Sequence, residues 1–138
     1  MLYRNQLHNY QTRAVEHIKQ HQQSMLWLDI GLGKTVSTLT ALSDLIAEGK
    51  VYGVLILAPL RVCQTVWEQE AKKWQHTKHL TFSLIHGSKN HRIRALKKQR
   101  MFYLLNYEGL PDARVQFINS YLAKGRPLPF NAVVVDES

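Results

Sequence analysis

The sequence predicts an α/β fold in which a parallel sheet carries helices on both faces. Apolar runs of strand length alternate along the chain with longer amphipathic stretches, which is the pattern of strand–helix units. A glycine-rich loop, Gly31-Leu32-Gly33-Lys34-Thr35, follows one apolar run, and the acidic pair Asp136-Glu137 follows another. Because ligands of such sheets bind at the carboxyl ends of the strands, we expect both segments at one edge.

Size and composition fit a single domain. The 138 residues are enough for one sizeable core, and the hydrophobic share of 45% is ordinary for a globular protein. Cys63 is the single cysteine, which argues against a disulfide framework and a cysteine-based metal site. The apolar runs are too short to span a bilayer and the N-terminus has no secretory pattern, so we expect no membrane and a cytoplasmic protein.

In the first half of the chain, periodicity and turn residues predict five elements. Helices are expected over residues 9–21, 34–48 and 61–74, and buried strands over residues 24–28 and 54–58. Tyr10, Ala14 and Ile18 recur at i, i+4 and i+8 in the first helix, the spacing of an amphipathic helix. In the third helix, Trp67 and Trp74 are seven residues apart on the apolar face, which favours core packing over base stacking.

The second half continues the alternation. Strands are expected over residues 80–85, 101–105 and 132–135, and helices over residues 88–99 and 110–123. Ser88 has the side chain to cap the first of these helices. A sheet built from these strands should be parallel, with right-handed crossover connections through the helices.

The positive charge of the chain is concentrated in its middle. The formal net charge is +8, and residues 61–100 hold ten Lys and Arg but two Asp and Glu. A clustered basic surface favours a polyanionic partner such as nucleic acid. On charge alone, a solvated helix face is an equally good interpretation.

The glycine-rich loop has the residue types that bind phosphate. Gly31 and Gly33 leave room for backbone N–H groups to converge, and the helix beginning near Lys34 adds the positive end of its dipole. Lys34 would reach the β- and γ-phosphates of ATP, and Thr35 would offer its hydroxyl to Mg²⁺. The full motif has glycine where this chain has Leu28, but the predicted strand and helix around the loop are the context that the motif requires.

The acidic pair near the end of the sequence would complete this site. An apolar strand over residues 132–135 delivers Asp136 and Glu137 to the edge where the loop is expected. Asp136 would hold Mg²⁺, directly or through water, and Glu137 would orient and deprotonate the attacking water. An exposed acidic end of the chain is the alternative, and the loop about one hundred residues upstream makes the catalytic interpretation the favoured one.

Together these motifs resemble superfamily 2 helicases and translocases, especially the Swi/Snf-like branch in the compact versions that bacteriophages carry. In that family a tyrosine-glutamine pair opens the domain and the glutamine reads the adenine, and Tyr10-Gln11 matches it. The phosphate loop of the branch typically reads as residues 31–35 do here, after an acidic pair of which this chain keeps Asp29. The resemblance extends from about Leu7 to Ser138.

Other motifs of the family follow in the same order. Pro59-Leu60-Arg61 looks like its first DNA-contact motif, and Asn106-Tyr107-Glu108 is similar to its later Thr-Tyr-Glu element. Residues 133–137 are similar to its DExx box, with Ser138 where alanine is usual. The resemblance implies phosphate contacts through Arg61 and nearby backbone amides, with double-stranded DNA as the expected partner. A sequence-independent contribution would come from Lys89, Arg92, Arg94, Lys97, Lys98 and Arg100.

The resemblance also implies a P-loop NTPase fold of the RecA-like type, incomplete at the C-terminus. Residues 1–138 would be the N-terminal helicase ATP-binding domain, truncated after the DExx box. A second RecA-like domain supplies the arginine finger in this family, so we expect the chain alone to hydrolyse ATP poorly or not at all. The implied setting is the cytoplasm of a bacterial cell or a phage-infected host.

Two other interpretations stay open at this stage. A different P-loop enzyme, such as a small-molecule kinase, would share the loop, although Tyr10-Gln11 and the late Asp136-Glu137 favour the helicase. A non-catalytic remnant that keeps nucleotide or DNA affinity is the other. The histidines show no metal-ligand spacing beyond His17 and His21, so we expect all seven at the surface. The sequence does not distinguish helicase from translocase or DNA from RNA, and it leaves the oligomeric state undetermined.

Overall fold

The computed structural model describes residues 1–20, 25–28 and 34–136 of the chain, and its centre is a five-stranded parallel sheet. The strand order is β1-β5-β2-β4-β3. In chain order the strands are β1 (Met25–Leu28), β2 (Val54–Ala58), β3 (Phe82–Ile85), β4 (Phe102–Asn106) and β5 (Ala132–Asp136). The prediction of a parallel sheet is therefore confirmed.

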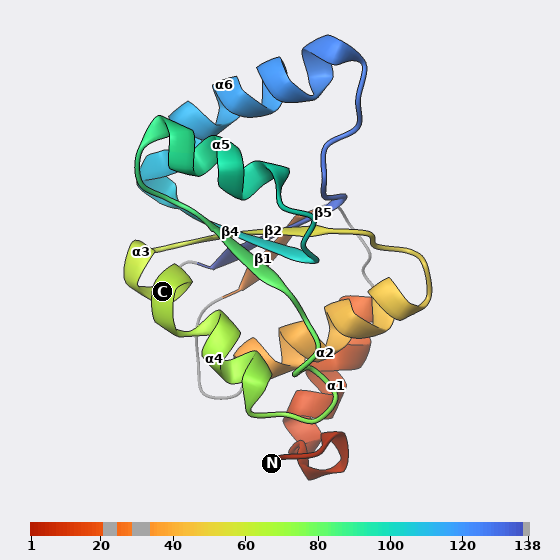
Figure 1. Ribbon diagram of the computed structural model, residues 1–138. Coiled ribbons are helices and arrows are strands. Elements are labelled where there is room, and N and C mark those ends of the chain that lie inside the picture. Colours follow the sequence, from red (N-terminus) through yellow and green to blue (C-terminus); the bar gives the residue numbers. More distant parts are fainter. Residues whose placement is uncertain (21–24, 29–33, 137–138) are drawn as a thin grey trace.

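Helices cover both faces of this sheet (Figure 1). One face carries α1 (Asn9–Gln20), α2 (Lys34–Ala47), α3 (Leu60–Thr65) and α4 (Trp67–Lys72). The other face carries α5 (Lys89–Lys97) and α6 (Leu110–Ser120). Three short 3-10 helices complete the chain: η1 (Arg4–Gln6), η2 (Tyr107–Gly109) and η3 (Leu122–Lys124). Among the described residues, no helix combines the length and apolar character needed to cross a bilayer.

The central strands are buried on both sides. Every residue of β2 and β4 is buried, which is the near-continuous apolar pattern of a strand within a covered parallel sheet. Side chains of β2 alternate between two core clusters, with Val54 and Ile56 facing the α2–α4 side and Leu55 and Leu57 facing the α5–α6 side. The sheet thus divides the interior into two layers.

Strand register fixes which residues share the carboxyl edge of the sheet. Leu28, at the end of β1, lies opposite Asp136, at the end of β5. Ala58, at the end of β2, lies opposite Asn106, at the end of β4. The segment that follows β1 therefore leaves the sheet at the edge where β5 delivers its carboxylate, as the sequence predicts.

The helix predicted over residues 61–74 is two helices in the structure. Val66 separates α3 from α4 with φ −95° and ψ −56°. Thr65 donates its hydroxyl to the Arg61 carbonyl at 2.7 Å, a local bond of the kind that bends helices. Trp67 and Trp74 are nevertheless 1% and 6% exposed, so the prediction that both pack in the interior is confirmed.

The buried face of α1 only partly follows the i, i+4, i+8 spacing of Tyr10, Ala14 and Ile18. Its buried residues are Gln11, Val15 and Ile18, whereas Tyr10 is 47% exposed. The helix packs against α2 through Val15, Ile18 and Ala41, outside the layer that touches the sheet. A second-layer helix needs only a narrow apolar stripe, which allows a polar residue such as Gln11 to take an inward position.

Three other boundaries differ from prediction by a turn or less. The edge strand β3 begins at Phe82 instead of residue 80, because the Leu80 amide donates to the Thr77 carbonyl in a turn. α5 ends at Lys97 and α6 at Ser120, each shorter than predicted. Ser88 caps α5 as expected, since its hydroxyl accepts from the His91 amide at 3.2 Å.

Candidate nucleotide site

Asp136 marks the candidate site at the carboxyl edge of the sheet. Its exposed fraction is 0%, and its backbone carbonyl accepts a hydrogen bond from the Tyr107 hydroxyl, which ties the end of β5 to η2. Lys34 opens α2, the helix that follows the phosphate-binding segment. The predicted site residues Gly31, Leu32, Gly33 and Glu137 lie outside the described residues.

The first turns of α2 bury an unusual number of hydroxyl groups. Thr35 is 9% exposed, Ser37 2%, and Thr38 and Thr40 0%. Hydroxyl oxygens can accept from backbone amides or bind a hard cation, and the positive end of the helix dipole lies at the same place. Thr35 is a hydroxyl residue in the first turn of α2, whereas the Thr40 hydroxyl is engaged with the Val36 carbonyl and His76.

Gln11 is fixed at the start of α1. It is 5% exposed, and its side-chain oxygen accepts a hydrogen bond from the His8 backbone amide at 2.8 Å. The backbone amide of Gln11 donates in return to the His8 carbonyl at 3.0 Å. Such a reciprocal arrangement holds both the side chain and the first turn of the helix in one conformation.

Tyr10 presents a flat aromatic surface beside this glutamine. Its ring stacks on that of His8 with centroids 5.8 Å apart and an interplanar angle of 7°. Both rings are exposed, and Tyr10 lies at the rim of a pocket.

A pocket of about 320 Å³ joins these residues to the start of α2. Tyr10, Gln11 and Val36 line it, so the structure brings the tyrosine-glutamine pair to the helix that follows the phosphate-binding segment. The other lining residues come from the N-terminal segment and α4, and they are Leu2, Gln6, His8, Glu70 and Trp74. Sequence reasoning missed Glu70, whose carboxylate accepts from the Trp74 indole nitrogen at 3.2 Å.

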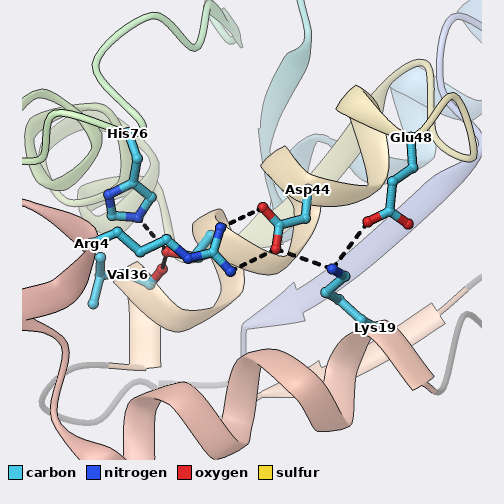
Figure 2. Close-up of polar contacts among 7 residues, drawn as sticks. Arg4, Lys19, Val36, Asp44, Glu48 and His76 are labelled. Carbon is cyan, nitrogen blue, oxygen red and sulfur yellow. Dashed lines mark hydrogen bonds and ion pairs between the residues drawn. The ribbon is translucent and has the colours of Figure 1, made fainter.

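A network of charged residues fastens the N-terminal segment to α2 (Figure 2). Both terminal nitrogens of Arg4 donate to the two carboxylate oxygens of Asp44, at 2.6 and 2.8 Å. Lys19 of α1 approaches Asp44 at 3.2 Å and Glu48 at 3.0 Å. Partial burial acts to raise the pKa of Asp44, but the hydrogen bonds from Arg4 and Lys19 outweigh it and hold the pKa below its ordinary value.

His76 adds a neutral contact to the same region. Its Nε2 lies 2.7 Å from the Thr40 hydroxyl, which itself donates to the Val36 carbonyl at 2.7 Å. Since that hydroxyl proton is committed, Nε2 must carry the proton that joins the ring to Thr40. Burial, with help from the nearby Arg4 charge, lowers the pKa of His76. His76 is therefore a partly buried structural residue, contrary to the prediction that all histidines lie at the surface.

The residues predicted to contact nucleic acid follow the carboxyl end of β2, at the same edge of the sheet as Asp136. Pro59 and Leu60 follow β2 and are half-buried, and Arg61 is exposed in the first turn of α3. Asn106, 7% exposed at the end of β4, donates its side-chain amide to Glu108 at 2.9 Å. This hydrogen bond lowers the pKa of the Glu108 carboxyl.

Cys63 is buried just behind this edge. Its thiol donates to the Ala58 carbonyl at 3.6 Å, and burial raises the pKa of the thiol to about 12. A neutral thiol of this kind is a packing residue and has little nucleophilic character. Among the described residues, no group of three or more His, Cys, Asp and Glu side chains is arranged to hold a metal ion.

Comparison with known proteins identifies relatives over nearly the whole chain. The family model described as SNF2-related domain matches residues 10–138. Protein p41 of Acyrthosiphon pisum secondary endosymbiont phage 1 is 37% identical over 131 residues, which cover 94% of this chain and 27% of p41. Chromodomain-helicase-DNA-binding protein 8 of Danio rerio is 28% identical over 148 residues, covering 97% of this chain and 6% of that protein.

A solved structure shares the fold. It is the SWI2/SNF2 ATPase core of Sulfolobus solfataricus in complex with dsDNA, with a TM-score of 0.64 and 20% sequence identity. The match covers 96% of this chain and 31% of that one. The RecA-like α/β fold expected from the sequence is thereby confirmed, and the chain spans about a third or less of the length of each of these three relatives.

Proposed function

Because the chain belongs to the SNF2-related domain family, we propose that residues 1–138 are the ATP-binding domain of an ATP-dependent DNA helicase or translocase. In the whole protein this domain would couple ATP hydrolysis to movement on nucleic acid. The observation that carries the proposal is the register of β1 and β5, in which Asp136 lies opposite Leu28. That register supports a single site built from the segment after β1, the start of α2 and the end of β5.

The phosphates of ATP would bind to the backbone amides of Gly31, Leu32 and Gly33 and to the Lys34 ammonium group. Thr35 and Asp136 would hold Mg²⁺, since hydroxyl and carboxylate oxygens are the ligands that this ion prefers. Both side chains are buried, Thr35 in the first turn of α2 and Asp136 at the end of β5, which fits this role. A bound Mg²⁺ would neutralise charge on the phosphates, and Glu137 would orient and deprotonate the attacking water.

The adenine base would occupy the pocket beside Gln11. The exposed ring of Tyr10 offers a stacking surface, and Gln11 offers an amide held in a fixed position. Val36 links this pocket to the helix that follows the phosphate loop, so base and phosphates can be held by one continuous surface.

Nucleic acid would bind near Pro59, Leu60 and Arg61. Arg61 is exposed and lies at the same edge of the sheet as Asp136. This proximity would allow ATP hydrolysis to change the contact with the bound nucleic-acid strand. The Sulfolobus solfataricus neighbour was solved with dsDNA, and duplex DNA is the partner that we propose here. A phage protein among the relatives favours the cytoplasm of a bacterial cell or phage-infected host as the place of action.

Binding of a fluorescent ATP analogue, measured with and without Mg²⁺, tests the proposed site. Asp136→Asn preserves the shape of a fully buried side chain but removes the charge that would attract the ion. We expect this variant to lose most of the gain in affinity that Mg²⁺ gives the parent chain. Asp112→Asn is the matched control, because Asp112 is exposed and paired with Arg92. Equal Mg²⁺ dependence in all three proteins would contradict the site.

Turnover is expected to be slow in the chain by itself. The family resemblance assigns the arginine finger to a second RecA-like domain, and such a finger contributes about 10³ to 10⁵ in rate. A steady-state ATPase assay with and without duplex DNA measures this directly. Rapid, DNA-stimulated hydrolysis by residues 1–138 would show that they contain a complete catalytic site.

A further inference from the structure

Glu70 is a carboxylate on the inward side of α4. Trp67 and Ala71 of this helix are each 1% exposed, and Glu70 lies beside them, three residues after Trp67. The side chain of Glu70 is 26% exposed, whereas that of Glu68, two residues earlier, is 49% exposed. A charge that is partly removed from water lowers stability unless other groups pair with it.

Two protein groups approach the Glu70 carboxylate. Its Oε1 accepts a hydrogen bond from the Trp74 indole nitrogen at 3.2 Å, and its Oε2 lies 3.4 Å from the Lys73 ammonium group. Because Trp74 is 6% exposed, its indole holds the carboxylate in a fixed direction, whereas the Lys73 side chain is 62% exposed and its ion pair is weak. A carboxylate accepts up to about four hydrogen bonds, so Glu70 keeps capacity for a ligand.

The same carboxylate lines the pocket proposed for the adenine base. Glu70 is the one acid among the lining residues that the structure describes. The two glutamines of the pocket use their side-chain oxygens on the backbone, since Gln6 accepts from the Tyr3 amide and Gln11 from the His8 amide, each at 2.8 Å. Because charged acceptors form the stronger hydrogen bonds, Glu70 is the strongest acceptor that these side chains offer to a ligand.

Purine bases differ in the group that such an acceptor would meet. Adenine carries an amino group at its 6-position, which donates hydrogen bonds, whereas guanine carries an oxygen there, which accepts them. A carboxylate therefore attracts the amino group and repels the oxygen. Leu2, Val36 and Trp74 supply apolar and aromatic walls, which suit the flat faces of a base but do not distinguish one purine from another.

We propose that Glu70 selects adenine in this pocket by accepting a hydrogen bond from the 6-amino group of the base. The inference rests on the proposed function, which assigns the base to this pocket. It adds a specificity-determining residue on α4, a helix that carries none of the nucleotide-binding motifs found in the sequence. The Trp74 indole is the positioning group, since it holds the carboxylate toward its ligand.

Competition between nucleotides tests the role of Glu70 in the whole chain. Each nucleotide displaces a fluorescent ATP analogue in the presence of Mg²⁺. The three competitors are ATP, inosine triphosphate, which has an oxygen at the 6-position, and purine riboside triphosphate, which has only hydrogen there. In Glu70→Gln, the new side chain keeps an oxygen that can accept from Trp74 and gains an N–H that can donate to a 6-oxygen.

We expect the parent to bind ATP at least about tenfold more tightly than inosine triphosphate, because a charged acceptor is lost or repelled when the 6-amino group is replaced. In Glu70→Gln this preference should disappear or reverse. Affinity for purine riboside triphosphate should be nearly the same in both proteins, since this nucleotide offers nothing at the 6-position to either side chain.

Glu68→Gln is the matched control, because it removes the same charge from the same helix. Glu68 is exposed and pairs with Lys72 at 3.8 Å, so this variant should keep the preference of the parent. Comparing nucleotides on one protein also cancels any loss of folded molecules. The thermal unfolding midpoint of Glu70→Gln measures such a loss separately.

Two results would overturn the role of Glu70 alone. One is an unchanged preference for ATP over inosine triphosphate in Glu70→Gln. The other is an equal loss of affinity for all three nucleotides, which would show that Glu70 serves only to hold Trp74. A parent chain that binds no triphosphate would contradict the nucleotide site itself and this inference with it, so the two failures are distinguishable.

Discussion

Gln11 is a polar residue of α1 that lines the pocket proposed to bind the adenine base. It is buried, bonded to the His8 amide, and placed beside Val36 at the start of α2. Replacing it with alanine removes an amide that would pair with the adenine base. One lost hydrogen bond of this kind costs about 1 kcal/mol or slightly more, so we expect roughly tenfold weaker ATP binding in Gln11→Ala.

Base selectivity distinguishes this role from a loss of helix capping. Affinity for inorganic triphosphate should be nearly the same in Gln11→Ala and the parent, because phosphates would bind elsewhere. The exposed neighbour Thr12 provides a control, and Thr12→Ala should bind ATP as the parent does. An equal loss of affinity for ATP and triphosphate in Gln11→Ala would indicate a structural role alone.

The lowered pKa of His76 makes the free energy of unfolding depend on pH. Burial lowers its pKa, so the unfolded chain binds more protons than the folded chain as pH falls below the ordinary value of about 6.5. The stability contributed by neutral His76 is fully present above that value and is lost as pH falls through the lower, folded pKa. We expect the urea midpoint of the parent to decline as pH falls below about 6.5.

Two histidine variants isolate this contribution. His76→Gln should flatten the decline of the urea midpoint with falling pH, whereas His86→Gln should leave it unchanged because His86 is exposed and is not among the charges that act on His76. The carboxyls of Asp44 and Glu48 titrate below this window, since their pKa values are held below the ordinary range. If the urea midpoints of the parent and His76→Gln change with pH in the same way, the interpretation that His76 is neutral and partly buried in the folded protein is contradicted.

At the scale of elements, the N-terminal segment is held to α2 by the Asp44 carboxylate. Arg4 binds it with two hydrogen bonds and Lys19 adds a third contact (Figure 2). We expect Asp44→Asn to lower the free energy of unfolding by about 1 kcal/mol, the upper end for partly exposed pairs, because two cations lose their partner. Urea unfolding measures this difference.

The pair of Lys72 and Glu68 is the matched control for that variant. The two groups lie 3.8 Å apart on one exposed helix face, a geometry that contributes about 0.3 to 0.5 kcal/mol. Glu68→Gln should therefore have a smaller effect than Asp44→Asn. Equal effects would mean that the docking of the N-terminal segment does not depend on the charged network.

Most elements could be predicted from the sequence because their signals are local. β2 is found at the predicted residues, since an apolar run closed by Pro59 admits few other structures. The division of α3 from α4 could not be predicted, because the bond from Thr65 to the Arg61 carbonyl forms only in one arrangement of the turn. The buried face of α1 could not be predicted from apolar spacing alone, because its packing partner is another helix and not the sheet.

The site shows the same difference between local and distant signals. The loop and the acidic strand end carry their chemistry in short motifs, and their shared edge follows from parallel strands alone. The docking of the N-terminal segment on α2 could not be predicted, since Arg4 meets its partner Asp44 forty residues further along the chain. Trp74 and His76, which contact Glu70 and Thr40, take their positions from the turn that follows α4, for which the sequence offers no periodic pattern.

At the scale of the whole molecule, the two edges of the sheet have different chemistry. Asp136, Glu108 and the start of α2 lie at the carboxyl edge. Exposed basic residues lie at the amino edge, and they are Lys97, Lys98, Arg100, Lys124 and Arg126. The sequence shows the excess of positive charge but not this separation, because residues 97–100 and 124–126 meet only after α5 and α6 have packed. Membership of the SNF2-related domain family is consistent with a chain that handles nucleotide at one edge.

The most direct test of the nucleotide site is the affinity of the chain for ATP when Lys34 is removed. Lys34 opens α2 at the point where the phosphates would bind, and Lys50 lies in the turn that follows the same helix. In a titration with ATP and Mg²⁺, we predict that Lys34→Ala binds at least about tenfold more weakly than the parent, while Lys50→Ala binds as the parent does. Equal ATP affinity of Lys34→Ala and the parent would contradict the site.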